Sequence, residues 1–386
     1  MSSLLILSTE FPPESGGIGK YTFEIARQLT TFGYRVVVVT NCMDGSEAFD
    51  RQAPFPVYRV GHDRWRYLKG LALAWKAVTV LKKHHCGYIL ATSWPYAGTL
   101  ALLLGKGLAL PYGVIGYGLE ITKYSARGVI GRWGRAVFTH SQKAFVISAF
   151  TRDVLQRRGI DPDHVVLLYA GVDAQFFQPG VADAGLRERY GLVGKKIILT
   201  VGRLVERKGH DTVLQALPQV ARHVPEVAYL IVGNGPHRAA LQALAHQLGV
   251  DRIVHFVGEV EEGDLPSFYR LCDVFAMPNR AVPATGDVEG FGLVFLEANA
   301  CAKPVIGGRS GGAVEAIVDG VTGVLVQPLE VGEIAGALVR ILTDAAYGTR
   351  LGQYGRQRVL QELTWTAVAR RLASWLPVAA EPGENT

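Results

Sequence analysis

The sequence predicts an α/β protein built from two doubly wound halves. Short, continuously apolar runs alternate with helical patterns along the chain, as expected for buried parallel strands and their crossover helices. This rhythm restarts after a turn-rich stretch, and 386 residues are enough for two domains. We therefore expect domains at residues 1–178 and 179–364. A final helix and tail follow at 365–386, for which a return to the first domain stays open.

The expected elements follow in chain order. Strands of the first half are the apolar runs Leu4–Ser8, Val36–Thr40, Tyr88–Ala91, Tyr112–Ile115, Ala144–Ile147 and Val165–Leu168. Strands of the second half are Ile197–Val201, Ala228–Val232, Ile253–Val257, Val274–Met277 and Pro304–Ile306. Helices are expected at Lys20–Thr31, Asp211–Arg222, His237–Leu248 and Trp365–Leu376. The uncharged stretch Cys86–Gly105 contains Ser93-Trp94-Pro95 and Gly98, which indicate a strand, loop and buried helix rather than a membrane span.

Composition excludes several classes of protein. Apolar residues make up 49% and charged residues 19%, which provides a core and excludes wholesale disorder. The cysteines lie far apart without a CxxC pattern, so a zinc site or disulfide scaffold is not expected and a reducing compartment is. The amino terminus MSSLLILSTE lacks the features of a signal peptide, which predicts a cytoplasmic protein.

The net charge of +6 is concentrated in one segment. Residues 59–85 contain one acid, Asp63, and the basic residues Arg59, Arg64, Arg66, Lys69, Lys76, Lys82 and Lys83. Its apolar residues recur at helical spacing, namely Leu68, Leu71, Ala72, Trp75, Ala77, Val78 and Leu81. Such a helix either packs on the domain with its lysines in water or contacts an anionic membrane surface. We favour the membrane, and nucleic acid is not expected.

A glycine-rich loop follows the first expected strand. The run Phe11-Pro-Pro-Glu-Ser-Gly-Gly-Ile-Gly-Lys20 leads into a helix, where backbone amides favour a diphosphate. It is not a Walker loop, because Glu14 stands where that motif requires its first Gly and Tyr21 stands where it requires Ser or Thr. A plain tight turn is the alternative. GxGxxG fingerprints are also absent, which makes a nicotinamide dehydrogenase an unfavourable interpretation.

Two charged motifs lie in the second half. Strand Ile197–Val201 leads into Gly202-Arg203-Leu-Val-Glu-Arg-Lys208-Gly209, whose cations suit a diphosphate unless they are simply solvated. Glu289 and Glu297 are separated by seven residues, with Gly290 and Gly292 after the first. A helix beginning near Gly292 would bury Glu297, which then needs a partner such as ribose hydroxyls. Its free amides at Phe291, Gly292 and Leu293 would face phosphate oxygens.

Together these motifs resemble retaining glycosyltransferases of family 4. The resemblance rests on the E-x7-E spacing, GRLxxxKG, Ser310-Gly-Gly-Ala-x-Glu315 and the FPPxxGGIG loop, and it covers essentially the whole chain. The stretch MPNRAVPATGDVEGFGLVFLEANACAKPVIGGRSGGAVE looks especially like bacterial phosphatidylinositol mannoside mannosyltransferases, which use GDP-mannose. The implied fold is GT-B, two Rossmann-like domains facing each other. The implied activity is metal-independent transfer of a hexose, with mannose favoured, to a lipid-linked or other hydroxyl acceptor.

The resemblance also implies roles for particular residues. Arg203 and Lys208 would neutralise the leaving diphosphate, Glu289 would contact the transferred sugar, and Glu297 would hold the ribose. Arg203, Lys208 and Glu289 are the expected catalytic residues, and no nucleophile is assigned. The implied donor-binding set is Gly16, Gly17, Arg203, Lys208, Val260, Glu262, Glu289, Gly290, Phe291, Gly292, Leu293 and Glu297. Glu262 favours guanine over uracil, with a solvated acidic turn as the alternative.

The chain departs from the family pattern on the acceptor side. Many relatives carry His in a pattern like HGxE, where this chain has Tyr117-Gly-Leu-Glu120, so Tyr117 and Glu120 are acceptor-side candidates. His140 is interpreted as an ordinary residue of the fold. The single DxD, Asp161-Pro-Asp163, is better explained as a turn, and no metal or other cofactor is expected.

Other functions stay open at this point. The same fold could use a UDP-sugar with a soluble or glycan acceptor, or act as a nucleotide-sugar epimerase or a phosphorylase. A non-catalytic nucleotide-sugar or glycan binding protein belongs to another class and is suggested only by Tyr117.

Overall fold

The structure is a computed structural model that describes residues 3–13, 17–61, 69–117, 121 and 128–377. The chain divides into two compact units, the first formed by residues 1–170 and 365–386 and the second by residues 171–364. Within the described residues, no helix combines the length and the apolar content needed to span a membrane.

The division at residue 170 lies before the boundary expected at 178. The cause is the bonding of the segment that follows it. Val172 N donates to Leu363 O at 2.9 Å, and the ring of Phe177 packs edge-on against Tyr269, so these residues belong to the second unit.

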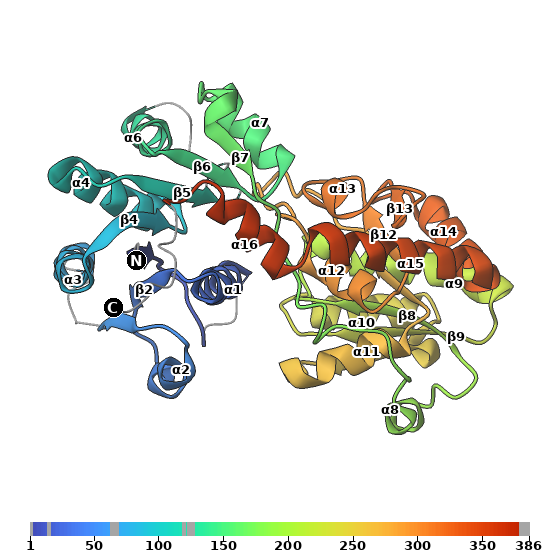
Figure 1. The fold of residues 1–386 in the computed structure, drawn as a ribbon. Coiled ribbons are helices and arrows are strands. Elements are labelled where there is room, and N and C mark those ends of the chain that lie inside the picture. Colours follow the sequence, from blue (N-terminus) through green and yellow to red (C-terminus); the bar gives the residue numbers. More distant parts are fainter. Residues whose placement is uncertain (1–2, 14–16, 62–68, 118–120, 122–127, 378–386) are drawn as a thin grey trace. The chain divides into compact units, whose positions relative to one another are not determined.

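The first unit contains a parallel sheet, which in the described residues has seven strands in the order β3-β2-β1-β4-β5-β6-β7 (Figure 1). Its strands are β1 (Ser3–Leu7), β2 (Arg35–Asn41), β3 (Val57–Val60), β4 (Cys86–Ala91), β5 (Tyr112–Gly116), β6 (Lys143–Val146) and β7 (Val165–Leu167). Its helices are α1 (Gly17–Thr31), α2 (Ser46–Gln52), α3 (Lys69–His84), the π-turn η1 (Trp94–Gly98), α4 (Thr99–Leu108), α6 (Gly128–Thr139), α7 (Ala149–Arg157), the 3₁₀ turn η2 (Pro162–His164) and α16 (Trp365–Ala373).

Helix α16 packs on helix α1 in this unit (Figure 1). The ring of Trp365 lies edge-on to Tyr21 with centroids 5.4 Å apart, and Thr366 Oγ1 donates to Gln28 Oε1 at 3.0 Å. The end of the chain therefore completes the first unit, in which the first residues also lie.

The second unit contains a parallel sheet with six described strands in the order β10-β9-β8-β11-β12-β13. They are β8 (Lys196–Val201), β9 (Val227–Val232), β10 (Val254–Gly258), β11 (Val274–Met277), β12 (Val305–Gly308) and β13 (Gly323–Val326). The helices are α8 (Ala184–Arg189), η3 (Glu206–Lys208), α9 (His210–His223), α10 (Arg238–Gln247), η4 (Asp251–Ile253), η5 (Glu262–Asp264), α11 (Leu265–Leu271), α12 (Leu293–Ala300), α13 (Ala313–Ala316), α14 (Val331–Thr343) and α15 (Ala345–Glu362).

The observed strands confirm the predicted α/β class with two doubly wound halves. Each sheet is parallel, and strands such as β1 and β9 are buried along their whole length, which explains their continuous apolar runs. The sequence reasoning missed β3 and β13. Strand β3 is half-buried along its length and contains Arg59, so its pattern resembles a solvated basic segment more than a buried strand.

Strand order reverses once in each sheet. In the first unit the reversal lies between β1 and β4, and in the second it lies between β8 and β11. The loops that leave the carboxyl ends of such strands separate on opposite sides and leave a crevice, where ligands bind in open α/β sheets. The candidate site should therefore be sought after β1 and β4 in one unit and after β8 and β11 in the other.

Candidate nucleotide-sugar site

The charged residues of the second unit meet at this reversal point. Lys208 ends the short turn η3 after β8, and Glu289 lies in the loop between β11 and α12. Lys208 Nζ and Glu289 Oε2 are 2.8 Å apart, and both side chains are about nine-tenths buried. Two residues from distant parts of the sequence thus form a buried ion pair at the place where the fold predicts a ligand.

A second cation completes this cluster. Arg207 Nε lies 3.5 Å from Glu289 Oε2, and its Nη1 lies 3.3 Å from Asp287 Oδ2. Burial alone would raise the pKa of Glu289, but Lys208 and then Arg207 outweigh this effect and hold the pKa below its ordinary value. Glu289 is therefore an ionised carboxylate at neutral pH, and it can only accept hydrogen bonds.

Arg203 differs from its neighbours. Its side chain is exposed, and it forms no ion pair with any residue in the described part of the chain. Nearby, Arg280 instead has a structural role: its guanidinium holds both oxygens of Asp211 at 2.9 and 2.8 Å, and its backbone N donates to Arg207 O. Arg203 is thus a cation left available to a ligand, while Arg280 fixes the loop that carries Arg207.

The helix after Glu289 begins as the sequence suggested. Gly292 caps α12 with φ of 87°, and a Cβ there would lie 2.6 Å from the Phe295 ring, so only glycine fits. Glu297 lies in the second turn, is 7% exposed, and its Oε2 accepts a 2.7 Å hydrogen bond from the Tyr269 hydroxyl. Burial and then the Glu297 charge raise the pKa of Tyr269 well above its ordinary value, which keeps this donor protonated.

The glycines of the Ser310–Glu315 motif support the Glu289 loop. Gly312 N donates to Glu289 O at 2.9 Å. A Cβ on Gly312 would lie 2.0 Å from Gly290 O, and one on Gly311, which has φ of 58°, would lie 2.5 Å from Glu289 O. This motif therefore has a structural reason to contain glycine: backbone packs directly on backbone behind the carboxylate.

The remaining predicted donor residues differ in exposure. Glu262 is exposed at the start of η5, Val260 is half-buried before it, and Phe291 is buried. In the first unit, Gly17 is the first residue of α1 and is exposed, and a Cβ added to it would meet no atom within 4 Å. Gly16 and Glu120 lie outside the described residues.

Tyr117 follows β5 and is 8% exposed. Its ring lies edge-on to Tyr21 at 5.5 Å, and Tyr21 in turn contacts Trp365. The Tyr21 hydroxyl donates to Leu168 O at 3.3 Å. The acceptor-side candidate is thus held by a row of aromatic rings that ends on the last helix of the chain.

The Arg59 side chain is buried and supports the glycine-rich loop after β1, so it is not part of a basic surface. Its side chain is 8% exposed and grips both oxygens of Asp50, at 2.8 and 2.9 Å. Its Nη1 donates to Asn41 O at 3.0 Å, and its Nη2 donates to Pro12 O in the loop after β1. The prediction that Arg59 contributes to a membrane-facing basic patch is therefore wrong, because its donors are used inside the unit.

Comparison with known proteins agrees with this geometry. Residues 15–176 match the family model described as Glycosyltransferase Family 4, and residues 186–358 match the one described as Glycosyl transferases group 1. The chain is 34% identical to the GDP-mannose-dependent alpha-(1-6)-phosphatidylinositol monomannoside mannosyltransferases of Mycobacterium tuberculosis and Mycolicibacterium smegmatis. Each alignment covers 97% of this chain and 98% of the relative. The chain belongs to glycosyltransferase family 4.

Solved structures agree on the fold. An Anabaena protein, HepE, crystallised with UDP has a TM-score of 0.82 at 21% identity, covering 97% of this chain and 99% of its own. Sucrose-phosphate synthase from Thermosynechococcus elongatus has a TM-score of 0.77 at 23% identity, covering 97% and 98%. The predicted GT-B class of this family 4 glycosyltransferase is thereby confirmed.

Two further sequence predictions concern residues outside the site. Asp161 Oδ1 accepts from Asp163 N at 2.9 Å and caps η2, so the DxD sequence forms a turn. His140 Nδ1 lies 2.9 Å from Ala136 O at the end of α6, as a local bond of the fold.

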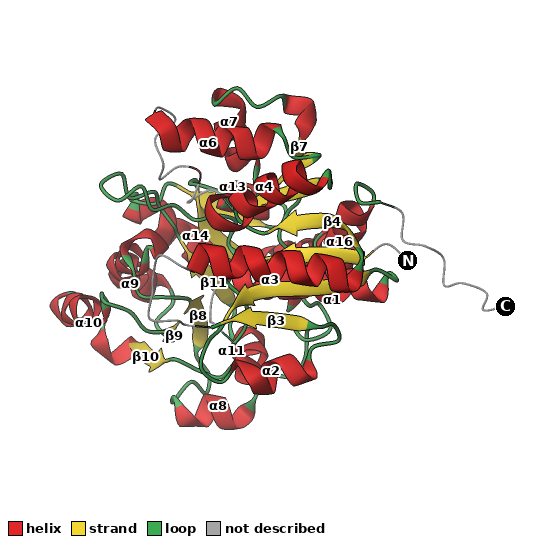
Figure 2. Cartoon of the chain, turned by 90° about the vertical axis from the view of Figure 1, so that its left-hand side faces the viewer, coloured by secondary structure: helices red, strands yellow, loops and turns green. Residues whose placement is uncertain are grey.

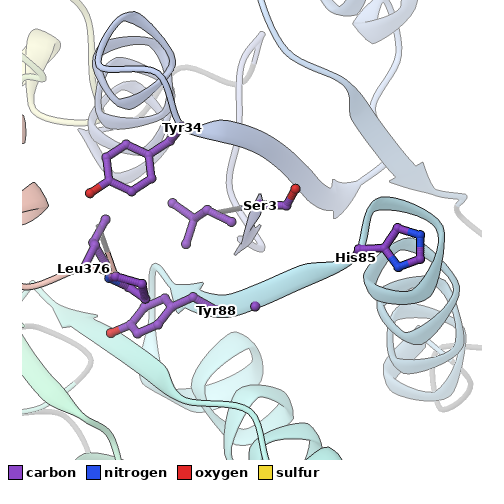
Figure 3. Close-up of a pocket in the computed structure, with 8 residues that line it drawn as sticks. Ser3, Tyr34, His85, Tyr88 and Leu376 are labelled. Atoms are coloured by element: carbon purple, nitrogen blue, oxygen red, sulfur yellow. The ribbon is translucent and has the colours of Figure 1, made fainter. Parts of the chain in front are cut away.

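A cavity of about 110 Å³ lies at the opposite, amino edge of the first sheet, lined by Ser3, Tyr34, His85, Tyr88 and Leu376 (Figure 3). It is separate from the loops of the glycosyltransferase site.

Sequence reasoning missed three contributors to this site. Arg207 was visible in the GRLxxxKG motif but was left without a role. Tyr269 and Asn279 carry no motif signal of their own. Asn279 Nδ2 donates to Ser310 O at 2.9 Å while its Oδ1 accepts from Gly308 N at 3.1 Å, which joins the loops after β11 and β12. Long-range partners of this kind cannot be read from residue spacing.

Proposed function

We propose that the chain is a retaining, metal-independent mannosyltransferase that uses GDP-mannose and a phosphatidylinositol-based glycolipid acceptor. The observation that carries this proposal is the 34% identity, over nearly the whole of both chains, to enzymes named for that donor and acceptor. The buried Lys208–Glu289 pair at the sheet reversal supplies the chemistry that such an enzyme needs.

Catalysis by this site is electrostatic. Lys208 and Arg203 would stabilise the negative charge that grows on the diphosphate as it leaves, a task that a metal ion performs in other glycosyltransferases. Glu289, held ionised by Lys208 and Arg207, would accept hydrogen bonds from hydroxyls of the transferred sugar. Attack by the acceptor on the same face, within the ion pair formed on departure, gives retention at the anomeric carbon.

Recognition of the nucleoside rests on Glu262 and Glu297 in this proposal, and of these two only Glu262 distinguishes one base from another. The exposed carboxylate of Glu262 can accept from the ring NH and the amino group of guanine, whereas uracil offers no such pair of donors. Glu297, positioned by Tyr269, would accept from ribose hydroxyls.

Location at the inner face of the plasma membrane is part of the same proposal. Helix α3 supports it, because Leu71 and Trp75 are 68% and 70% exposed while the domain core takes Leu73, Ala77 and Val80 instead. Lys76 and Lys83 lie over the Tyr58 ring, at 5.2 and 5.3 Å, and residues 62–68 of the basic segment lie outside the described residues. Lys82 and Lys83 are exposed on the same helix, so the described surface keeps these lysines and the exposed apolar residues but not Arg59.

The test is transfer from labelled GDP-mannose to a phosphatidylinositol mannoside in the presence of EDTA. The expected product carries an α-linked mannose by NMR, and Glu289→Gln should reduce turnover by at least about a hundredfold. Calorimetry with GDP, UDP and ADP distinguishes the alternatives. Binding of UDP alone would replace the donor assignment, loss of activity with EDTA would replace the metal-free mechanism, and binding of none would favour a non-enzymatic role.

A further inference from the structure

The charge asymmetry of the first unit extends well beyond residues 59–85. Between Asp63 and Asp153 the one acidic residue is Glu120, whereas thirteen Lys and Arg residues occur. Helices α3, α4 and α6 and the turn η1 contain no Asp or Glu at all. The remainder of the chain then has a net negative balance, so this stretch is a distinct basic region of the protein.

These helices form one layer on one face of the first sheet. Buried residues of α3, η1, α4 and α6 share a single core cluster with the strands, including Ala77, Trp94, Ala101 and Val137. Figure 2 looks onto this layer, with α3, α4 and α6 one above another. Their outward sides therefore face the solvent together, and their charges act on the same surface.

Exposed apolar side chains gather on that layer. On α6, Val129 is 83%, Ile130 is 57% and Trp133 is 41% exposed, at the spacing that places them on one side of a helix. On α3 and η1, Leu71, Trp75 and Tyr96 are about 70% exposed. Single exposed apolar residues are ordinary, but a group on neighbouring acid-free helices indicates a contact surface.

The group lies at a particular end of the layer. Crossover helices run antiparallel to their strands, so the first turns of α3 and α6 lie at the carboxyl edge of the sheet. That edge also carries the glycine loop after β1 and Tyr117 after β5. Trp133 is fixed there, since its Nε1 donates to Thr99 Oγ1 at 3.0 Å in the first turn of α4.

We infer that α6 is a second membrane anchor, and that α3, η1 and α6 form one surface that binds an anionic lipid bilayer. Apolar and aromatic side chains enter the headgroup region, while the lysines and arginines attract anionic lipid. A membrane is favoured over a protein partner, because α3, η1, α4 and α6 contain Lys and Arg but no Asp or Glu, and the exposed group includes Trp and Tyr. This inference deepens the proposed function, because it places a lipid acceptor beside the acceptor-side residues.

The experiment measures binding to vesicles of equal parts phosphatidylcholine and phosphatidylglycerol. The variant Val129→Ser/Ile130→Ser should weaken binding by about tenfold, as should Leu71→Ser/Trp75→Ser. The combined variant should not bind measurably, and wild-type binding should fall with added salt and on pure phosphatidylcholine. The control Val181→Ser/Val193→Ser changes two exposed valines of the second unit, 93% and 70% exposed, and should bind like wild type.

Several outcomes would overturn the inference. An α6 variant that binds vesicles like wild type, while the α3 variant fails, would limit the contact to α3. Wild type that ignores vesicles, or that buries the α6 surface in a dimer in solution, would assign the surface to another partner. GDP affinity and transfer to a deacylated, water-soluble acceptor should survive the α6 change. If wild type does not transfer mannose to the water-soluble acceptor, the proposed function is refuted, whereas the conclusion from vesicle binding is unaffected.

Discussion

Replacing Lys208 by Met tests the buried ion pair most directly. At an effective dielectric constant of about 20, unit charges 2.8 Å apart attract by about 6 kcal/mol, and charges 3.5 Å apart by about 5 kcal/mol, before desolvation is subtracted. Removing one partner of a buried pair typically costs about 3–5 kcal/mol. Arg207 remains beside Glu289, so we expect the lower end, about 3 kcal/mol.

The assay is calorimetric unfolding of the whole chain at pH 7. A loss of about 3 kcal/mol in a unit the size of residues 171–364 should lower its Tm by about 6–12 °C. The double variant Lys208→Met/Glu289→Gln removes the stranded carboxylate and should regain part of the loss. The matched control is Lys195→Met, whose exposed pair with Glu226 should matter by about 0.5 kcal/mol or less.

The pH dependence provides an independent check of the same pair. The folded-state pKa of Glu289 is lowered, so its contribution is present above the unfolded-state pKa of about 4.3 and is lost as pH falls through the folded value. The stability difference between wild type and Glu289→Gln should therefore be constant from pH 7 to pH 6 and shrink only in acid. A Tm for Lys208→Met within about 2 °C of wild type would refute the electrostatic reasoning, as would a difference that titrates near neutrality.

Three other perturbations have expected outcomes. His210 is buried, and its ring nitrogens have no hydrogen-bond partner among the described residues. Burial, and then the Lys208 charge, lowers the pKa of His210 to about 4, so the free energy of unfolding of wild type should fall by about 2 kcal/mol between pH 7 and pH 5. Thermal unfolding at both pH values should show a much smaller loss for His210→Phe. Arg59→Lys should cost about 3 kcal/mol of stability and weaken both GDP binding and transfer, because Arg59 supports the glycine loop through Pro12 O, whereas Arg27→Lys at a more exposed pair should change neither. A fully active Arg59→Lys enzyme with wild-type GDP affinity would exclude this supporting role. Gly312→Ala should weaken GDP binding at least about tenfold by titration calorimetry, because it displaces the Glu289 loop. The control Gly332→Ala lies in open space on α14 and should bind GDP like wild type. Its free energy of unfolding should be unchanged or higher by about 0.5–1 kcal/mol.

The predictable part of the fold is the part in which each residue's environment is set locally. Buried strands such as β8 and β9 consist mainly of apolar residues, and their boundaries are predicted to within about two residues. Strand β3 escaped because it is short and half-buried, so tertiary contacts decide its conformation. The end of the first domain was placed late for a related reason, since the bond from Val172 to Leu363 joins residues far apart in sequence.

The site was predictable residue by residue but not pair by pair. Sequence spacing brought out Lys208 and Glu289 separately, and it could not show that they share a buried ion pair. The error over Arg59 has the same origin: a cation in a basic segment is taken as solvated until Asp50 and Pro12 are seen around it. Charge counts over a segment therefore need to be corrected for the cations that the fold uses internally.

The strand order explains why the charged motifs of this chain lie so far apart in its sequence. The two loops meet at the reversal point because their strands, β8 and β11, are neighbours in the sheet although two strands, β9 and β10, lie between them in the chain. At the buried cluster, the loop after β8 contributes the cations Arg207 and Lys208, and the loop after β11 contributes the carboxylates Asp287 and Glu289, so neither loop alone can satisfy its own buried charge. The glycines behind Glu289 close the arrangement, because any side chain at Gly312 would occupy the position of the Gly290 carbonyl. Charge pairing and backbone packing thus impose the same loop geometry, which is why the spacing of the motif is informative about the site.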